Sequence, residues 1–258
     1  MTPDLAAYFP DGTWLQPVLY LVVAGFVGSL ARGFSGFGGA LIFMPLASAA
    51  VGPQVGAPIL LLVDGVIQLG LLRNAWRRAR RREVATMAAG TVLGIPIGAA
   101  MLKHLHPTDV RWGISVLILC MLALLISGWR YHGTPTPRVT FGVGIITGLL
   151  SGVAQAAGPP VVAYWLGGQT APAMVRANII LLFFCTSVVA SISYVVAGLF
   201  DSRVLALGAV TAPGYMLGMF LGSRMFGLAS EHMFRRICFA LIAAAAIISL
   251  PVLDSLLR

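Results

Sequence analysis

The chain is a succession of long apolar runs joined by short polar loops, and this pattern restricts it to folds that are embedded in a membrane. About 20 apolar residues are needed to cross the hydrocarbon core as a helix. Of the 258 residues, 59% are hydrophobic and only 10% are charged, whereas soluble domains average roughly 25% charged. A soluble fold of this length would not have enough polar surface to cover its core.

The apolar runs divide into two sets of five. In the first half they occupy approximately residues 15–33, 34–50, 54–72, 84–103 and 109–129. In the second half they occupy approximately 138–156, 159–170, 173–199, 203–223 and 234–254. The second run of each set is short and interrupted by glycine or proline, so the sequence leaves open whether it spans or re-enters. We expect an all-α, polytopic transmembrane bundle of about 8–10 membrane segments.

The two halves also align with each other at a constant offset of 120 residues. Glycines and a threonine match as well as apolar residues: the pairs are Gly28 with Gly148, Gly38 with Gly158, Thr91 with Thr211, Gly94 with Gly214 and Gly98 with Gly218. Apolar identities alone would be weak evidence, because membrane sequences use few residue types. The alignment therefore predicts a first transmembrane repeat at 1–128, a linker at 129–138 and a second repeat at 139–258.

The distribution of basic residues predicts how the segments cross. If the acidic N-terminus lies outside and every segment crosses, most of the lysines and arginines fall on the inside, as the positive-inside rule requires. The outside receives only Lys103, Arg111, Arg203 and Arg258. The net charge of +9 is thus assigned to the cytoplasmic face and its anionic lipids rather than to nucleic acid. An odd number of crossings in each unit would make the repeats inverted, a common plan of secondary transporters.

The most unusual residues lie at the junction of the first two segments in each half. The first junction contains Gly36, Gly38 and Gly39, and the second contains Gly158 and Pro159. Such residues weaken a continuous helix, and irregular backbone at membrane depth survives only where protein buries it or where it lines a cavity. We expect each junction to turn or unwind beside a cavity.

A helix that begins at such a break directs free amide groups and a partial positive charge into the cavity, which suits an anion. Two inverted copies would bring two such ends toward one site, and the aligned Ser35 and Gln155 could donate hydrogen bonds there. The alternative is that the glycines only let helices pack closely. We favour packing for single glycines and a binding site for the symmetric pair of breaks.

Among the charged residues, Asp64 is the acidic one set well inside an apolar segment. A charge near the bilayer centre costs about 2.5–3.5 kcal/mol on insertion scales, so such a residue faces a cavity or a partner. Asp64 could carry a coupling proton, or it could be a structural carboxylate paired with Arg32. Arg32 could bind the anion or extend to the cytoplasmic surface, and Asn178 is a further candidate for the cavity wall.

The remaining polar residues are weaker candidates. Thr91 and Thr211 are more often expected to bond their own helix carbonyls, and Gln68 and Gln169 rank below them. Neither the histidines nor the cysteines form a cluster with metal-ligand spacing, and no nucleophile–base arrangement or cofactor fingerprint is visible. We therefore expect no enzyme activity, no metal and no cofactor.

The two junctions resemble the duplicated glycine-rich motifs of the sulfite exporter TauE/SafE family of membrane anion carriers. The phrases are GFSGFGGALIFMP at 33–45 and SGVAQAAGPPVVAYW at 151–165; the second has AAGPP where the family pattern has a glycine triplet. The resemblance covers nearly the whole chain and implies transport of sulfite, an organosulfonate such as sulfoacetate or a related small anion across a bacterial inner membrane.

We therefore predict a multi-pass secondary transporter that moves such an anion by proton-linked alternating access. The residues expected to hold the anion are Arg32, Ser35, Gly36, Gly38, Gly39, Gln155, Gly158, Pro159 and Asn178, with Asp64 as the proton carrier. An anion channel and a carrier for a small organic anion without sulfur remain as alternatives. The sequence does not address transport direction or oligomeric state.

Overall fold

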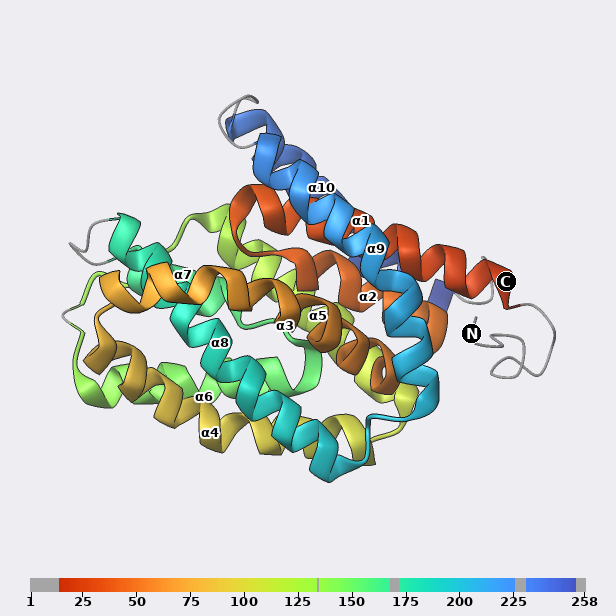
Figure 1. Ribbon diagram of the computed structural model, residues 1–258, viewed down its shortest axis with the longest axis horizontal. Coiled ribbons are helices and arrows are strands. Elements are labelled where there is room, and N and C mark those ends of the chain that lie inside the picture. Colours follow the sequence, from red (N-terminus) through yellow and green to blue (C-terminus); the bar gives the residue numbers. More distant parts are fainter. Residues whose placement is uncertain (1–13, 134, 168–171, 226–230, 254–258) are drawn as a thin grey trace.

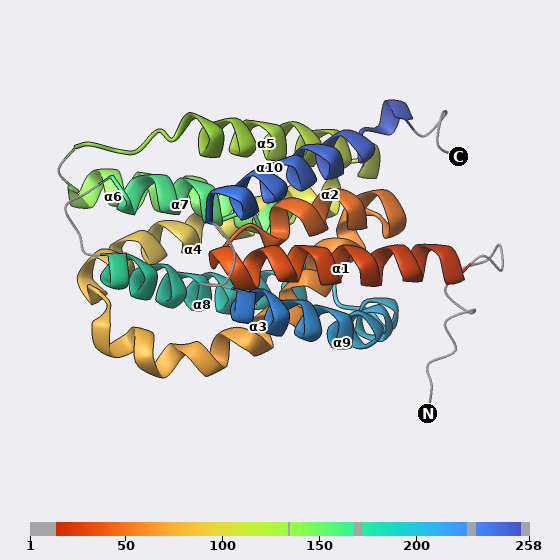
Figure 2. The same ribbon diagram turned by 90° about the horizontal axis from the view of Figure 1, so that it is seen from above.

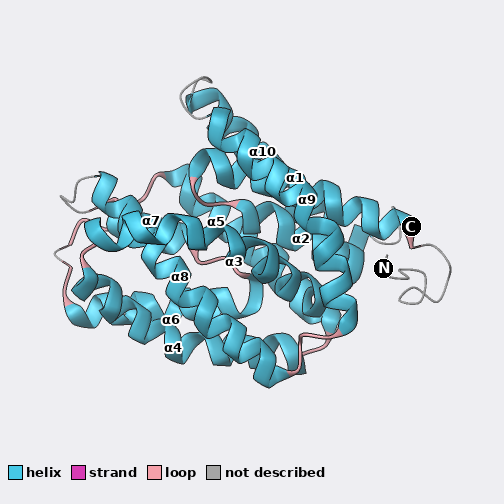
Figure 3. Ribbon diagram, viewed as in Figure 1, coloured by secondary structure: helices cyan, strands magenta, loops and turns pink. Residues whose placement is uncertain are grey.

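The computed structural model describes residues 14–133, 135–167, 172–225 and 231–253, and in these ranges it consists of helices joined by short loops, with no strand (Figures 1 and 3). The helices are α1 (Leu15–Ser35), α2 (Gly39–Val51), α3 (Pro53–Arg78), α4 (Arg81–His104), α5 (Pro107–Ser127), α6 (Pro137–Ala154), α7 (Gly158–Trp165), α8 (Pro172–Ala197), α9 (Ser202–Met225) and α10 (Glu231–Ile248), followed by the short 3₁₀ helix η2 (Pro251–Leu253). Each expected apolar segment corresponds to one of these helices. The all-α prediction is confirmed.

The helix ends follow local sequence rules. Proline stands in the first turn of α3, α5 and α6, where its missing N–H would have had no intrahelical partner. Glycine in the left-handed conformation ends α1 at Gly36 and α5 at Gly128, because only glycine adopts positive φ without steric cost. At these helix ends the residues that start or stop the helix can be recognised in the sequence.

Six helices of the described chain are long and apolar enough to cross a membrane. Their outward faces carry large apolar side chains, including Val196 (81% exposed), Ile192 (61%) and Leu217 (53%). A soluble monomer does not expose apolar surface on this scale. The protein is therefore a polytopic helical membrane protein.

The closest helix packing joins the two halves of the chain. The glycines at 90, 94 and 98 on α4 face those at 144, 148 and 152 on α6, so tightly that a Cβ at Gly94 would overlap the Ile145 carbonyl oxygen. On the other side of the molecule α1 packs in the same way on α9, where a Cβ at Gly222 would overlap the Leu30 carbonyl oxygen. Small residues allow this backbone approach. The packing interpretation holds for these glycines.

The first helix of each predicted repeat thus packs on the fourth helix of the other repeat, and α3 lies against α8 between them (Figure 2). This exchange interleaves the two halves instead of placing them side by side. It is the arrangement that two copies related by a two-fold axis would produce. The division at 1–128 and 139–258 itself remains a prediction from the sequence.

The short helices α2 and α7 turn back beside the helices that precede them. A Cβ at Gly28 would lie 3.4 Å from the Cβ of Phe43, and one at Gly39 would lie 3.1 Å from the Cβ of Arg32, so α1 and α2 run antiparallel. In the second half the hydroxyls of Thr140, near the start of α6, and Tyr164, near the end of α7, lie 2.6 Å apart. Each short helix therefore folds back on the helix before it and forms a hairpin with it.

The charge count from the sequence assumed that every apolar segment crosses. Arg32, counted with the inner residues on that assumption, lies instead at the tip of the first hairpin, opposite the middle of α3. If both hairpins re-enter, α3–α5 and α8–α10 still leave an odd number of crossings in each unit. The inverted relation of the repeats therefore survives as a prediction.

Candidate functional site

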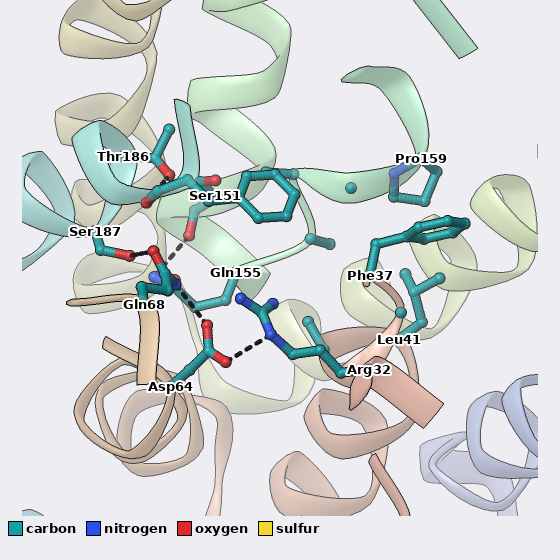
Figure 4. A pocket seen from close by; sticks show the side chains of 16 residues that line it. Arg32, Phe37, Leu41, Asp64, Gln68, Ser151, Gln155, Pro159, Thr186 and Ser187 are labelled. Carbon is teal, nitrogen blue, oxygen red and sulfur yellow. Dashed lines mark hydrogen bonds and ion pairs between the residues drawn. The ribbon is translucent and has the colours of Figure 1, made fainter. Parts of the chain in front are cut away.

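The two hairpin tips meet at a small polar cavity, called the central cavity below, which lies in the middle of the helix bundle (Figure 4). Its volume is about 30 Å³, space for roughly one or two water-sized groups. Its walls come from both breaks, from α3 and from α8: Arg32, Phe37, Gly38, Ala40, Leu41, Asp64, Gln68, Ser151, Gln155, Ala156, Ala157, Gly158, Pro159, Phe183, Thr186 and Ser187. The sequence had pointed to this meeting of the two breaks.

An ion pair between Arg32 and Asp64 forms the charged side of the central cavity. The Arg32 Nε lies 2.7 Å from an Asp64 carboxylate oxygen, and the two side chains are only 13% and 11% exposed. The same oxygen accepts a hydrogen bond from the Tyr215 hydroxyl at 2.8 Å. The other oxygen accepts one from the Gln68 amide at 2.7 Å. The carboxylate is thereby satisfied on both oxygens, as a buried charge must be.

Arg32 uses only part of its donor capacity in this pair. A guanidinium has five N–H groups, and among the described residues its two terminal nitrogens have no hydrogen-bond partner. Figure 4 shows them directed away from Asp64 toward Gln155 and Ser151. The Phe183 ring lies against the guanidinium, with its centroid 5.6 Å from Cζ. Four N–H donors of one fixed cation therefore face the cavity.

The first break, residues 36–38, is a glycine turn that leaves backbone donors free. Gly36 and Gly38 have φ of 79° and 97°, a region that other residues rarely adopt. At the start of α2 the Leu41 amide bonds to the Gly38 carbonyl oxygen at 3.0 Å. The amides of Gly39 and Ala40 have no partner in the described chain, as expected for the first turn of a helix. The positive end of α2 therefore lies at the cavity.

Ser35 stabilises this turn from the side that faces away from the central cavity. Its hydroxyl donates to the Ala31 carbonyl oxygen at 2.8 Å and also contacts the Phe37 carbonyl oxygen. Ser35 does not line the central cavity; it lines a second cavity on the other side of Phe37. The expectation that it faces the same site as Gln155 is therefore not met in this conformation.

The second break, residues 155–157, is built differently. Gln155 has φ of 53°, the one positive φ of a non-glycine residue in the described chain. Its side-chain amide donates to the Tyr194 hydroxyl and the Ser151 carbonyl oxygen, both at 3.1 Å. The Tyr194 hydroxyl in turn donates to the Gly152 carbonyl oxygen at 2.8 Å. This network stabilises Gln155 in the left-handed conformation, which glycine more commonly adopts.

Prolines limit the donors at the second break. Gly158 begins α7 and is followed by Pro159 and Pro160, which carry no N–H. The first turn of α7 therefore presents the Gly158 amide and two apolar rings. The two helix ends at the cavity are not equivalent, although the sequence suggested a symmetric pair.

The cavity brings together Arg32, Gly38, Asp64, Gln155, Gly158 and Pro159 among the residues singled out from the sequence. Gly36 and Gly39 shape the first turn without lining the cavity. Asn178 lies elsewhere: its side-chain oxygen accepts the Arg80 amide at 2.8 Å and so ties α8 to the loop before α4. Thr91 and Thr211 bond carbonyl oxygens of their own helices, as expected.

Several polar residues of the site were ranked low or missed. Gln68 had been a weak candidate, and Gln169 lies outside the described residues. Tyr215, Ser187 and Tyr194 were not identified at all. Ser187 donates to the Gln68 side-chain oxygen at 3.3 Å, which extends the network from Asp64 to α8. Each lies in a long helix of mainly apolar residues, where no sequence pattern separates it from a packing residue.

Comparison with known proteins gives a consistent match. The family model described as Sulfite exporter TauE/SafE matches residues 21–249. A protein of Cupriavidus necator named "Probable sulfite/organosulfonate exporter TauE" is 26% identical over 256 residues, which cover 93% of this chain and 97% of the relative. No solved structure was found to match the chain.

Proposed function

Since the chain belongs to the sulfite exporter TauE/SafE family, we propose that it carries sulfite or a small organosulfonate such as sulfoacetate across the bacterial inner membrane. The relative from Cupriavidus necator, which is similar over nearly the whole chain, is named for sulfite and organosulfonates. The observation that carries the proposal is a buried arginine whose terminal N–H groups face the central cavity beside the start of α2.

In this proposal Arg32 holds the anion. Guanidinium groups present paired donors that match the geometry of an oxyanion such as a sulfonate. The Ala40 amide adds a hydrogen bond from the positive end of α2, and the Gly158 amide adds one from the opposite hairpin. Sulfite and sulfonates share the pyramidal arrangement of three oxygens on sulfur, so this donor set suits both.

Asp64 couples anion binding to a proton in the proposed mechanism. The ionised carboxylate neutralises Arg32 at 2.7 Å and repels a second negative charge at the same place. When Asp64 is protonated, the full charge of Arg32 becomes available to the anion. Binding of anion and proton is then mutually favourable, and by linkage each strengthens the other by the same factor. Proton and anion would move in the same direction.

The size of the cavity favours alternating access over a permanently open pore. A volume of about 30 Å³ is too small for an organosulfonate, so the hairpin tips must separate to admit it and close behind it. Inverted repeats provide the two equivalent arrangements that such a cycle needs. An anion channel would require a continuous wet path instead.

The test is flux of radiolabelled sulfite and sulfoacetate into proteoliposomes, with and without an imposed proton gradient. We expect saturable flux that increases when the gradient is directed with the anion. Flux that rises linearly with concentration and ignores the gradient would favour the channel. If neither compound moves but another small organic anion does, the sulfur assignment is wrong.

A single substitution tests whether Asp64 couples anion flux to the proton gradient. Asp64→Asn keeps the shape of the side chain and removes its proton, so it should leave anion exchange measurable while flux loses its response to the proton gradient. Asp109→Asn, which changes an exposed carboxylate at the start of α5, is the matched control and should respond as the wild type does. Gradient-dependent flux in Asp64→Asn would remove Asp64 from the mechanism.

A further inference from the structure

A second and larger cavity adjoins the central cavity. It has a volume of about 280 Å³ and lies between the tip of the first hairpin and helices α5, α7 and α10. Phe37 and Gly38 line both cavities, so the two are separated by this one part of the first break. Ser35, which faces away from the central cavity, is exposed in the larger one.

The larger cavity extends toward the end of the molecule that the arginine-rich loops occupy. Its walls include the end of α5 and the loop after it, at Gly128, Trp129 and Arg130, and the early part of α10 at Arg235 and Cys238. By the charge distribution this is the inner end. The cavity therefore runs from the predicted inner surface to the hairpin tip.

Two arginines supply the positive charge of an otherwise mainly apolar cavity. Arg130 is exposed, and Arg235 is held by a hydrogen bond of 3.0 Å from its terminal nitrogen to the Leu125 carbonyl oxygen. The Phe239 ring also lies against the Arg235 guanidinium at 5.2 Å. A cleft with low-dielectric walls and charge of one sign raises the local concentration of the opposite ion.

The corresponding region on the opposite side of the molecule is closed. There α2 packs against α5 and α10, and Leu41, Ile42, Phe43 and Met44 are at most 1% exposed. The pseudo-equivalent helix α7 leaves Val162 and Ala163 lining the larger cavity instead. The central cavity is thus sealed by several buried layers on one side and by Phe37 on the other.

We propose that this larger cavity is a water-filled inner vestibule through which small anions reach Arg32. Arg130 and Arg235 gather them, and the Phe37 side chain is the barrier between the vestibule and the central cavity. The choice of ion rests on the proposed function; the vestibule and its barrier do not. Phe37 is packed on the second hairpin, where a Cβ at Gly158 would lie 3.2 Å from its Cβ, so movement of either tip moves the barrier.

The native thiol of Cys238 in the vestibule wall provides a test that needs no transport assay. With Cys120→Ala and Cys185→Ala as background, inverted membrane vesicles are treated with an anionic reagent, sulfonatoethyl methanethiosulfonate, or its cationic trimethylammonioethyl counterpart. We expect labelling by both, with the anionic reagent favoured. Arg130→Gln and Arg235→Gln should each lower that preference about threefold.

The matched control is Arg224→Gln. Arg224 is an exposed arginine at the end of α9, stacked on Phe220 at 4.6 Å, and it does not line the vestibule. Its replacement should leave the preference unchanged. Equal losses in all three variants would mean that only the general surface charge matters, and the gathering role of Arg130 and Arg235 would be wrong.

A second probe tests the barrier. Thr186→Cys, in a chain without other cysteines, places a thiol in the central cavity. It should react slowly with the anionic reagent, and at least tenfold faster when Phe37→Ala is added. Equal rates would overturn the barrier role. If Cys238 reacts only with a membrane-soluble maleimide, lipid fills the larger cavity and the vestibule proposal fails, whatever the protein transports.

Discussion

The two hairpin tips that form the central cavity differ more than their aligned sequences suggest. The first is a glycine turn with an adjacent arginine, free amides at the start of α2 and Phe37, which lines both cavities. The second has a left-handed glutamine fixed by Tyr194 and is followed by two prolines. One tip provides charge and adaptable backbone, and the other provides a rigid wall.

If the halves are copies of one unit, as the sequence predicts, this difference would show how a duplicated unit can specialise. The residue aligned with Arg32 is Gly152, and the residue aligned with Asp64 is Phe184, so the ion pair exists once. In the proposed mechanism a single pair would bind one anion and one proton per cycle, whereas a second pair would place four charges in one small cavity. We infer that the first hairpin carries the chemistry and the second positions it.

Removing the positive charge of Arg32 at the first hairpin tip should have the largest effect on anion flux. Arg32→Gln removes the guanidinium and leaves the carboxylate of Asp64 buried without its charged partner. In comparable ion pairs this lowers stability by about 3–5 kcal/mol. We expect anion flux in proteoliposomes to fall by about 100-fold or more. Arg176→Gln, an exposed arginine at the start of α8, should retain nearly full flux.

A double variant separates folding from binding at Arg32. Arg32→Gln combined with Asp64→Asn leaves no unpaired charge, so its thermal stability in detergent should return toward that of the wild type. Its flux should remain at the level of Arg32→Gln alone. Recovered flux in the double variant would mean that Arg32 acts only by neutralising Asp64, and the first tip would lose its binding role.

Substitutions that change backbone freedom should alter the stability of the protein by different amounts at the two turns. Gly38→Ala forces a Cβ at φ of 97° and should lower stability by about 1–2 kcal/mol. Gln155→Gly should change it less, because relief of the positive φ offsets hydrogen bonds that together contribute about 1 kcal/mol. Thermal unfolding in detergent measures both.

Gly113→Ala is the control for these turn variants, since a Cβ at this helical position meets no atom within 4 Å; it should be neutral or slightly stabilising. A larger loss for Gln155→Gly than for Gly38→Ala would show that the side-chain network, rather than backbone conformation, maintains the second tip. The second tip would then be the more sensitive of the two to substitution.

The smallest effect is expected from restoring a backbone donor at the second tip. Pro159→Ala adds one N–H in the first turn of α7 and removes the ring from the cavity wall. One added neutral hydrogen bond contributes about 1 kcal/mol, so the apparent affinity for sulfite should change by no more than about fivefold. Concentration dependence of flux gives this value. A change as large as that of Arg32→Gln would mean that the second tip dominates binding.

The residue types along the chain were sufficient to predict the helices, although the predicted ends differ from the observed ones by several residues at α2, α3 and α10. Long apolar runs, proline in first turns and glycine after last turns depend on interactions within a few residues. The two breaks were found for the same reason, since glycine and proline act on the local backbone. The cavity partners of Asp64 were not found, because Tyr215 and Gln68 look like packing residues until α3 and α9 are placed together.

By itself the sequence determined that this protein is a polytopic helical bundle of the membrane and that each half contains one broken segment, and it predicted that the halves are related. Only the tertiary structure decided that those segments fold back as hairpins, that their tips meet and that Arg32 pairs with Asp64 rather than extending to the surface. The first set follows from hydrophobicity and backbone conformation, which are local. The second depends on contacts between helices far apart in the chain, where a few glycines determine how closely the backbones approach.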